Sequence, residues 1–65
     1  MFAANEKRIV GEKKAAVAMG LAVQTLRNMR HQRRGPAYLK IGRSVRYDLQ
    51  DIEAYLQKRK IDPEA

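Results

Sequence analysis

The sequence predicts a small α+β domain with winged helix-turn-helix architecture: two helices around a glycine turn, a two-stranded β-hairpin and a C-terminal helix. Three observations predict it. Apolar residues recur with helical spacing on both sides of Gly20, the period changes to two between Tyr38 and Tyr47, and a helical pattern returns after Asp48. With 65 residues, the chain has room for one domain with a thin core.

The chain is expected to form one domain between two short flanking segments. Residues 1–8 are predicted to form a flexible N-terminal lead, residues 9–61 the domain, and residues 62–65 a C-terminal tail. Ile9 and Val10, the first pair of β-branched residues, are expected to dock on the core. Because no apolar run is long enough for a signal peptide or a membrane span of about 20 residues, we expect a cytoplasmic protein without a membrane partner.

The first helix is predicted over residues 12–19. Ala15 and Ala16 lie on its apolar face, and their small side chains allow another helix to approach closely. Gly20 supplies the positive φ that ends the helix, and Leu21 follows as an apolar residue in a tight turn.

The second helix is predicted to begin at residue 22 or 23 and to end at about residue 33. Leu26 and Met29 form its buried stripe, which Ala22 extends by one turn. Gly35-Pro36 stops this helix because proline lacks the backbone N–H that a helix needs.

A β-hairpin is predicted over residues 38–47. Two segments of alternating β-branched and aromatic residues flank a turn formed by Gly42, Arg43 and Ser44, which places Arg43 at the tip.

The third helix is predicted over residues 48–60. Asp48 is suited to the N-cap position, and Asp51 favours the positive end of the helix dipole. Asp62-Pro63 ends the helix. The expected apolar stripe consists of Leu49, Ile52, Tyr55 and Leu56.

The net charge of +7 is concentrated in one segment. Residues 27–46 contain no acidic residue, whereas the remaining basic residues are balanced by the seven acids of the chain. An unmixed basic block inside a folded domain indicates a polyanionic partner, with a surface kept basic for solubility as the simpler alternative. The basic residues of the segment are Arg27, Arg30, Arg33, Arg34, Lys40, Arg43 and Arg46.

The second helix has an outer polar stripe suited to the major groove of double-stranded DNA. Arg27 can bond to guanine O6 and N7, and Gln24 and Asn28 can pair with adenine N6 and N7. Thr25, Arg30 and His31 are expected to reach phosphates or flanking base edges. As a lone histidine, His31 is expected to be solvated or to contact phosphate rather than to ligate a metal.

The hairpin and the end of the second helix supply the expected flanking contacts. Arg43 is predicted to project toward the neighbouring minor groove, where a narrow groove deepens the negative potential. Arg33 and Arg34 are either phosphate contacts or simply a charged helix end. The remaining wing contacts are expected from Lys40, Ser44 and Arg46.

The sequence resembles the small excisionases of the MerR-like and AlpA-like winged-helix group, over about residues 9–60. The resemblance implies a recombination directionality factor that binds and bends attachment-site DNA, often in several adjacent copies, and directs an integrase toward excision of a phage or integrative element. It places Gln24, Arg27, Asn28 and His31 at recognition-helix positions, and Arg43 and Arg46 in the wing. The residues that resemble the family are Ala15-Ala16, Gly20-Leu21, Thr25-Leu26-Arg27-Asn28, the segment from Gly35 to Tyr47, and Asp51-Ile52-Glu53-Ala54-Tyr55-Leu56.

Two residues depart from the family pattern. Ala22 stands where many relatives have a Ser or Thr helix cap, and Met29 stands where many have a large aromatic residue. Neither departure changes the outer polar stripe.

Two other functions remain open from the sequence. An AlpA-type transcriptional regulator would use the same DNA-binding surface. An RNA-binding accessory module is less compatible, because RNA readers expose aromatic residues on a sheet and this chain is 6% aromatic. An enzyme is not expected, since the sequence has no nucleophile–base set, metal set or phosphate loop, and therefore no cofactor or small-molecule substrate is predicted.

Overall fold

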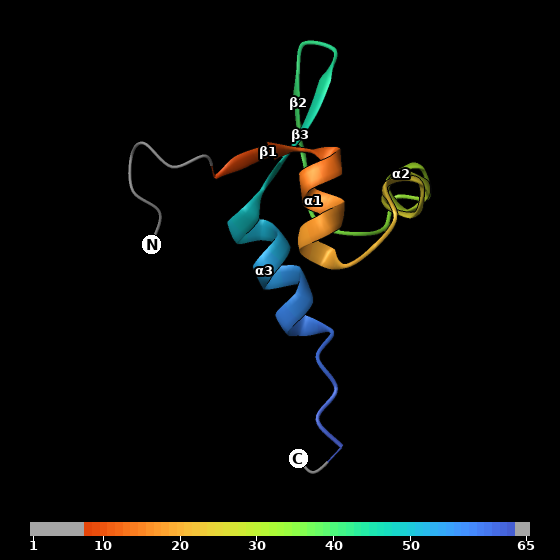
Figure 1. Cartoon of the computed structure of the whole chain (residues 1–65), viewed down its shortest axis with the longest axis vertical. Helices are drawn as coiled ribbons and strands as arrows, with labels where there is room; N and C mark the ends of the chain where they lie inside the picture. Colours follow the sequence, from red (N-terminus) through yellow and green to blue (C-terminus); the bar gives the residue numbers. More distant parts are fainter. Residues whose placement is uncertain (1–7, 64–65) are drawn as a thin grey trace.

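The computed structural model describes residues 8–63 and confirms a small α+β fold of the winged helix-turn-helix type. Figure 1 shows α1 in the centre, with α2 and α3 on its two sides and the β2–β3 hairpin projecting beyond the helices. Except for Arg8, the predicted N-terminal lead lies outside the described residues. The elements are β1 (Ile9–Gly11), α1 (Glu12–Met19), α2 (Val23–His31), β2 (Leu39–Ile41), β3 (Ser44–Asp48) and α3 (Leu49–Lys58).

The sheet has three antiparallel strands in the order β1-β3-β2, whereas the sequence predicted only the hairpin. Val10 pairs with Tyr47, and its burial confirms that Val10 docks on the core, whereas Ile9 is only half-buried and pairs with Asp48. The Leu49 N–H donates to the Arg8 carbonyl at 3.0 Å, and Arg8 pairs with Asp48 at 3.1 Å. β1 has only three residues, which is too short for a recognisable alternation of apolar and polar side chains. It can therefore be identified as a strand only from its pairing with β3.

The turn between α1 and α2 forms as predicted. Gly20 has a φ of 69°. Its N–H donates to the Val17 carbonyl at 3.0 Å, and the Leu21 N–H donates to the Ala16 carbonyl at 2.9 Å. These two bonds form the glycine-ended helix stop known as a Schellman motif, which satisfies carbonyls that a helix end leaves open.

Helix α2 ends at His31, so the predicted end near Arg33 is wrong. Arg33 instead adopts a φ of 59°, in the left-handed region. Its N–H donates to the Arg30 carbonyl at 3.0 Å, and the Arg34 N–H donates to the Met29 carbonyl at 2.7 Å. The chain therefore makes a second Schellman stop, with an arginine where α1 has a glycine.

The buried side of α2 also differs from the prediction. Leu26 is buried as expected, but Met29 is only half-buried and Ala22 is exposed. Ala22 lies at the N-cap without a side-chain hydrogen bond, and Val23, the first residue of α2, packs against the core instead. Met29 lies next to Gly35, in the loop that follows α2.

The core is small and lies where α1, α2, α3 and the sheet meet. Leu26 and Tyr47 are its largest fully buried side chains. Ala15 and Ala16 of α1 are almost completely buried, which confirms that they permit close packing. The core residues are Val10, Ala15, Ala16, Leu26, Tyr47 and Ile52.

The hairpin has a turn of two residues rather than three. Ser44 already belongs to β3 and pairs with Ile41. Gly42 takes a φ of 60°, while Arg43 keeps a negative φ. Glycine at the first turn position is typical of the type II′ turn, whose twist matches that of the flanking strands.

Helix α3 begins as predicted and ends earlier. The Gln50 N–H donates to Asp48 Oδ1 at 2.8 Å, which confirms Asp48 as the N-cap. Ile52 is buried, but Leu56 is 39% exposed, so the prediction that Leu56 joins the buried stripe is wrong. The reason is that α3 runs away from the sheet, as Figure 1 shows, and its second half passes beyond the core. Arg59 covers the ring of Tyr55, with its guanidinium carbon 3.8 Å from the ring centroid.

Candidate nucleic-acid interface

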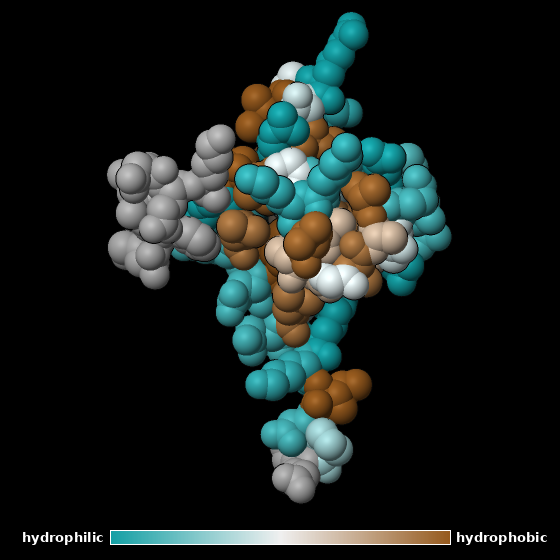
Figure 2. All heavy atoms as spheres, in the orientation of Figure 1, coloured by the Kyte–Doolittle hydropathy of each residue, from teal (hydrophilic) through white to brown (hydrophobic). Residues whose placement is uncertain are grey.

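The predicted polar stripe lies on the outer side of α2. Gln24, Thr25, Asn28 and His31 are all exposed, because Leu26 and Val23 turn the opposite side of the helix toward the core. Gln24 Nε2 donates to Asn28 Oδ1 at 3.0 Å. Figure 2 shows hydrophilic surface over α2, whereas hydrophilic and apolar side chains are mixed over α1.

Arg27 does not extend freely into solvent, because Glu12 of α1 holds it. Arg27 Nε donates to Glu12 Oε1 at 3.0 Å, and Arg27 Nη2 donates to Oε2 at 2.8 Å. A guanidinium has five N–H donors, and Glu12 uses two of them. The Nη1 edge therefore remains available, on a side chain that is still 39% exposed and already fixed in direction.

Arg30 turns inward, although it belongs to the same basic segment. Its side chain is 14% exposed, and its Nη1 donates to Glu12 Oε1 at 3.4 Å and to the Tyr47 hydroxyl at 3.5 Å. Its guanidinium carbon also lies 5.8 Å from the centroid of the Tyr38 ring. Arg30 thus links α2 to α1 and to the sheet.

Glu12 is the residue of this site that sequence reasoning missed. The hydrogen bond from Arg27 holds the pKa of its carboxyl below the ordinary value of 4.5, and attraction to Arg27 and Arg30 adds to this effect against the opposing effect of burial. An acid at the start of one helix shows no sign in the sequence of pairing with an arginine fifteen positions later.

We expect Glu12→Gln to lower the melting temperature by a few degrees at pH 7 and to flatten its dependence on pH. A carboxyl with a depressed folded-state pKa stabilises the fold above its unfolded-state pKa, and this stability is lost as pH falls through the folded value. The wild-type and variant melting temperatures should therefore converge below pH 4.5. Thermal unfolding from pH 7 to pH 3 measures this, with Glu53→Gln, an exposed acid on α3, as the control. If the melting temperatures of wild type and Glu12→Gln changed in parallel with pH, the stabilising role of the Glu12 carboxylate would be contradicted.

The hairpin divides its polar residues between two faces. Lys40 is paired with Val45, and Val45 lies on the same face of β3 as the buried Tyr47. Because α2 contacts the Tyr47 hydroxyl through Arg30, this is the face on which α2 lies.

The other predicted wing residues lie elsewhere on the hairpin. Ser44 and Arg46 alternate to the opposite face, where Arg46 Nη1 donates to the Val45 carbonyl at 3.0 Å. Arg43 is exposed in the turn. The structure therefore brings Lys40 to the side of α2 and does not bring Arg46 there.

The end of α2 presents two further arginines. Arg33 and Arg34 are both exposed, and Arg34 Nε donates to Gln32 Oε1 at 2.9 Å.

Over residues 8–63, no cluster of three or more His, Cys, Asp or Glu side chains has an arrangement that would hold a metal ion. In the same part of the chain, no helix has the length and apolar character needed to cross a membrane.

A family model described as a helix-turn-helix domain matches residues 13–60. The matched range runs from the second residue of α1 through the hairpin to just beyond α3, and it leaves out β1 and Glu12. No curated protein matches the chain.

Proposed function

We propose that this chain, which belongs to the helix-turn-helix domain family, binds double-stranded DNA in a sequence-specific manner, with α2 in the major groove. Membership of this family, which includes AlpA-like and excisionase-like small DNA-binding proteins, supports DNA binding. The observation that most favours α2 as the reading element is its exposed polar stripe, which lies opposite buried Leu26 and within a segment free of acidic residues. The major groove is wide enough to admit such a helix.

In this proposal, Arg27 reads guanine through the Nη1 edge that Glu12 leaves open. A side chain already fixed by an ion pair loses less conformational entropy when it binds, which favours this arrangement. Gln24 and Asn28 read adenine, which requires them to exchange their mutual hydrogen bond for bonds to the base. Thr25 and His31 contact the flanking phosphates or base edges.

The wing and its flanks hold the DNA backbone. Lys40 approaches it from the face that α2 shares, and Arg43 reaches toward the adjacent minor groove from the turn. Ser44 and Arg46 flank this contact from the opposite face of the hairpin. Arg33 and Arg34 add positive charge where α2 ends.

We propose further that the protein is an excisionase, which bends attachment-site DNA and directs an integrase toward excision. The resemblance of the segment from Gly35 to Tyr47, with the acidic helix start that follows, supports this role. Additional copies of the chain along the DNA are the other expected partner. An AlpA-type transcriptional regulator is the second candidate, because the same surface would serve it.

An excision assay separates these two roles. Purified integrase from the same genetic element is incubated with supercoiled attachment-site DNA, with and without this protein, while a reporter measures output from the neighbouring promoter. An excisionase raises the yield of excised product. An unchanged excision yield together with altered promoter output would favour the regulator.

We expect Arg27→Ala to weaken binding to a preferred duplex about tenfold and to relax base preference at the position that it reads. The preferred duplex comes from selection out of a random DNA pool, and fluorescence anisotropy compares it with a scrambled duplex. Glu12→Gln is the matched control, since it breaks the same ion pair but keeps the guanidinium. Equal losses for Arg27→Ala on both duplexes would exclude direct base reading by this residue.

A further inference from the structure

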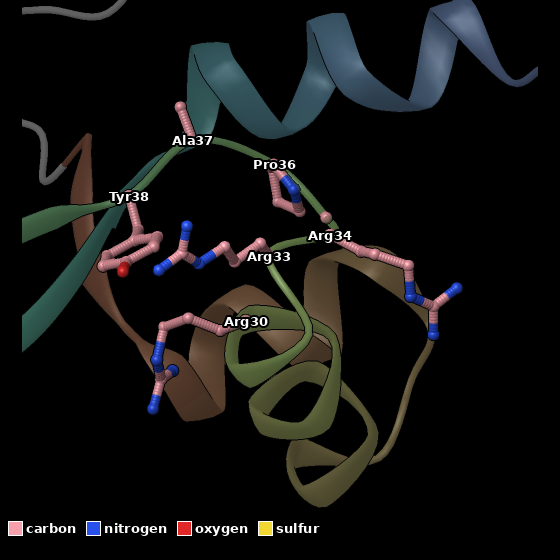
Figure 3. A pocket seen from close by; sticks show the side chains of 7 residues that line it. Arg30, Arg33, Arg34, Pro36, Ala37 and Tyr38 are labelled. Carbon is pink, nitrogen blue, oxygen red and sulfur yellow. The ribbon is translucent and has the colours of Figure 1, made fainter.

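A pocket of about 560 Å³ opens between the end of α2 and the start of β2. Figure 3 shows that Arg30 and Arg33 extend toward the side of the pocket where Tyr38 lies, whereas Arg34 extends the opposite way. None of its lining residues is acidic, and among residues 8–63 no acidic side chain pairs with Arg33. The lining residues are Arg30, Arg33, Arg34, Gly35, Pro36, Ala37 and Tyr38.

We propose that this pocket is a binding site for one phosphodiester group of the DNA backbone, which Arg33 binds together with Arg30 and Tyr38. The assignment rests on the proposed function and adds a specific backbone contact to it. Guanidinium groups present N–H donors in a fork that matches the oxygens of a phosphate. The Tyr38 hydroxyl is a further donor, while the exposed Ala37 offers an apolar contact against which a deoxyribose can pack.

The backbone at Arg33 is the second, independent observation. Its φ of 59° is sterically unfavourable for any residue with a Cβ atom. At the end of α1, Gly20 makes the same pair of hydrogen bonds without this cost. The helix stop alone would therefore favour glycine at position 33, and strain of this kind is found where a side chain serves a binding site.

The end of a helix is not intrinsically attractive to an anion, because its free carbonyls carry partial negative charge. Here that effect is reduced, since the Met29 carbonyl accepts from Arg34 N–H and the Arg30 carbonyl accepts from Arg33 N–H. The electrostatic potential in the pocket is therefore positive, because the guanidinium groups outweigh the backbone carbonyls. Arg30 is already shared with Glu12, which leaves Arg33 as the main binding group.

Arg33→Gly tests the assignment, because it should raise the stability of the fold and weaken the binding of DNA. Removal of the strained backbone should raise the melting temperature by about 4 °C. Loss of the guanidinium should weaken binding to the selected duplex about tenfold and reduce the slope of log K against log salt by about 1. Arg34→Gly is the matched control: it removes the same charge one residue away and should cause a clearly smaller loss.

A titration with inorganic phosphate distinguishes the DNA backbone from a free anion. Backbone amide shifts at residues 33–35 and 37–38 should move with the duplex and remain unchanged at millimolar phosphate. Saturation of the pocket by phosphate alone at submillimolar concentration would overturn the backbone assignment.

Two further outcomes would also overturn it: equal losses for Arg33→Gly and Arg34→Gly, or wild-type affinity in Arg33→Gly. Failure of the wild-type chain to bind any duplex would instead overturn the proposed function itself.

Discussion

Leu26→Ala is expected to reduce the free energy of unfolding by about 2–5 kcal/mol. Leu26 is 1% exposed and is one of the two largest fully buried side chains, so its truncation leaves a cavity at the centre of a core of six residues. A domain of this length is stable by only about 3–10 kcal/mol, at roughly 0.05–0.15 kcal/mol per residue. A large fraction of the variant should therefore be unfolded at 37 °C.

Urea unfolding followed by circular dichroism measures this loss, and Leu56→Ala is its matched control. Leu56 is also a leucine in an amphipathic helix, but it is 39% exposed, and its truncation should change stability by no more than about 0.5 kcal/mol. Equal losses at the two positions would mean that α3 packs more fully in solution than the structure shows.

Raising the salt concentration from 50 to 200 mM is expected to weaken DNA binding about 150-fold. Four exposed basic residues of the segment do not pair with an acid among the described residues and lie at proposed backbone contacts: Arg33, Lys40, Arg43 and Arg46. If each neutralises one phosphate, the slope of log K against log salt is about −3.6. Arg34 is left out because it extends away from the phosphate pocket (Figure 3). Arg27 and Arg30 are left out of this sum because Glu12 already pairs with both.

Anisotropy titrations at four salt concentrations give the slope. Arg43→Ala should make it shallower by about 0.9, because one phosphate contact is lost. Lys14→Ala removes the same charge from α1, where Lys14 lines a different hollow with Val10 and Leu49, and should leave the slope unchanged. A wild-type slope shallower than about −2 would show that phosphate neutralisation is not the main source of affinity.

Much of the fold was predictable because it is decided within a few neighbouring residues. Gly20 and Gly42 adopt the positive φ values that their turns require, and Asp48 caps α3. Helical periodicity likewise placed Leu26 in the core and the polar residues of α2 outside it, since opposite sides of one helix cannot both be buried against the same neighbours.

The predictions failed where an element extends beyond its neighbours. Met29 and Leu56 continue the apolar stripes of α2 and α3, but no other element covers them fully. Periodicity gives the direction of a side chain and not the length over which a partner lies against the helix. β1 was missed for a related reason, because its three residues become a strand only by pairing with β3.

The composition and order of the residues thus determined that this chain forms a basic winged helix-turn-helix domain with α2 as its exposed polar helix. Only the tertiary structure decided which arginines of that segment are available. Glu12, fifteen residues before Arg27, fixes Arg27 and draws Arg30 inward, and strand alternation turns Arg46 away from the face of α2. Local sequence sets backbone conformation and periodicity over a few residues, whereas these side-chain contacts depend on how distant segments pack together.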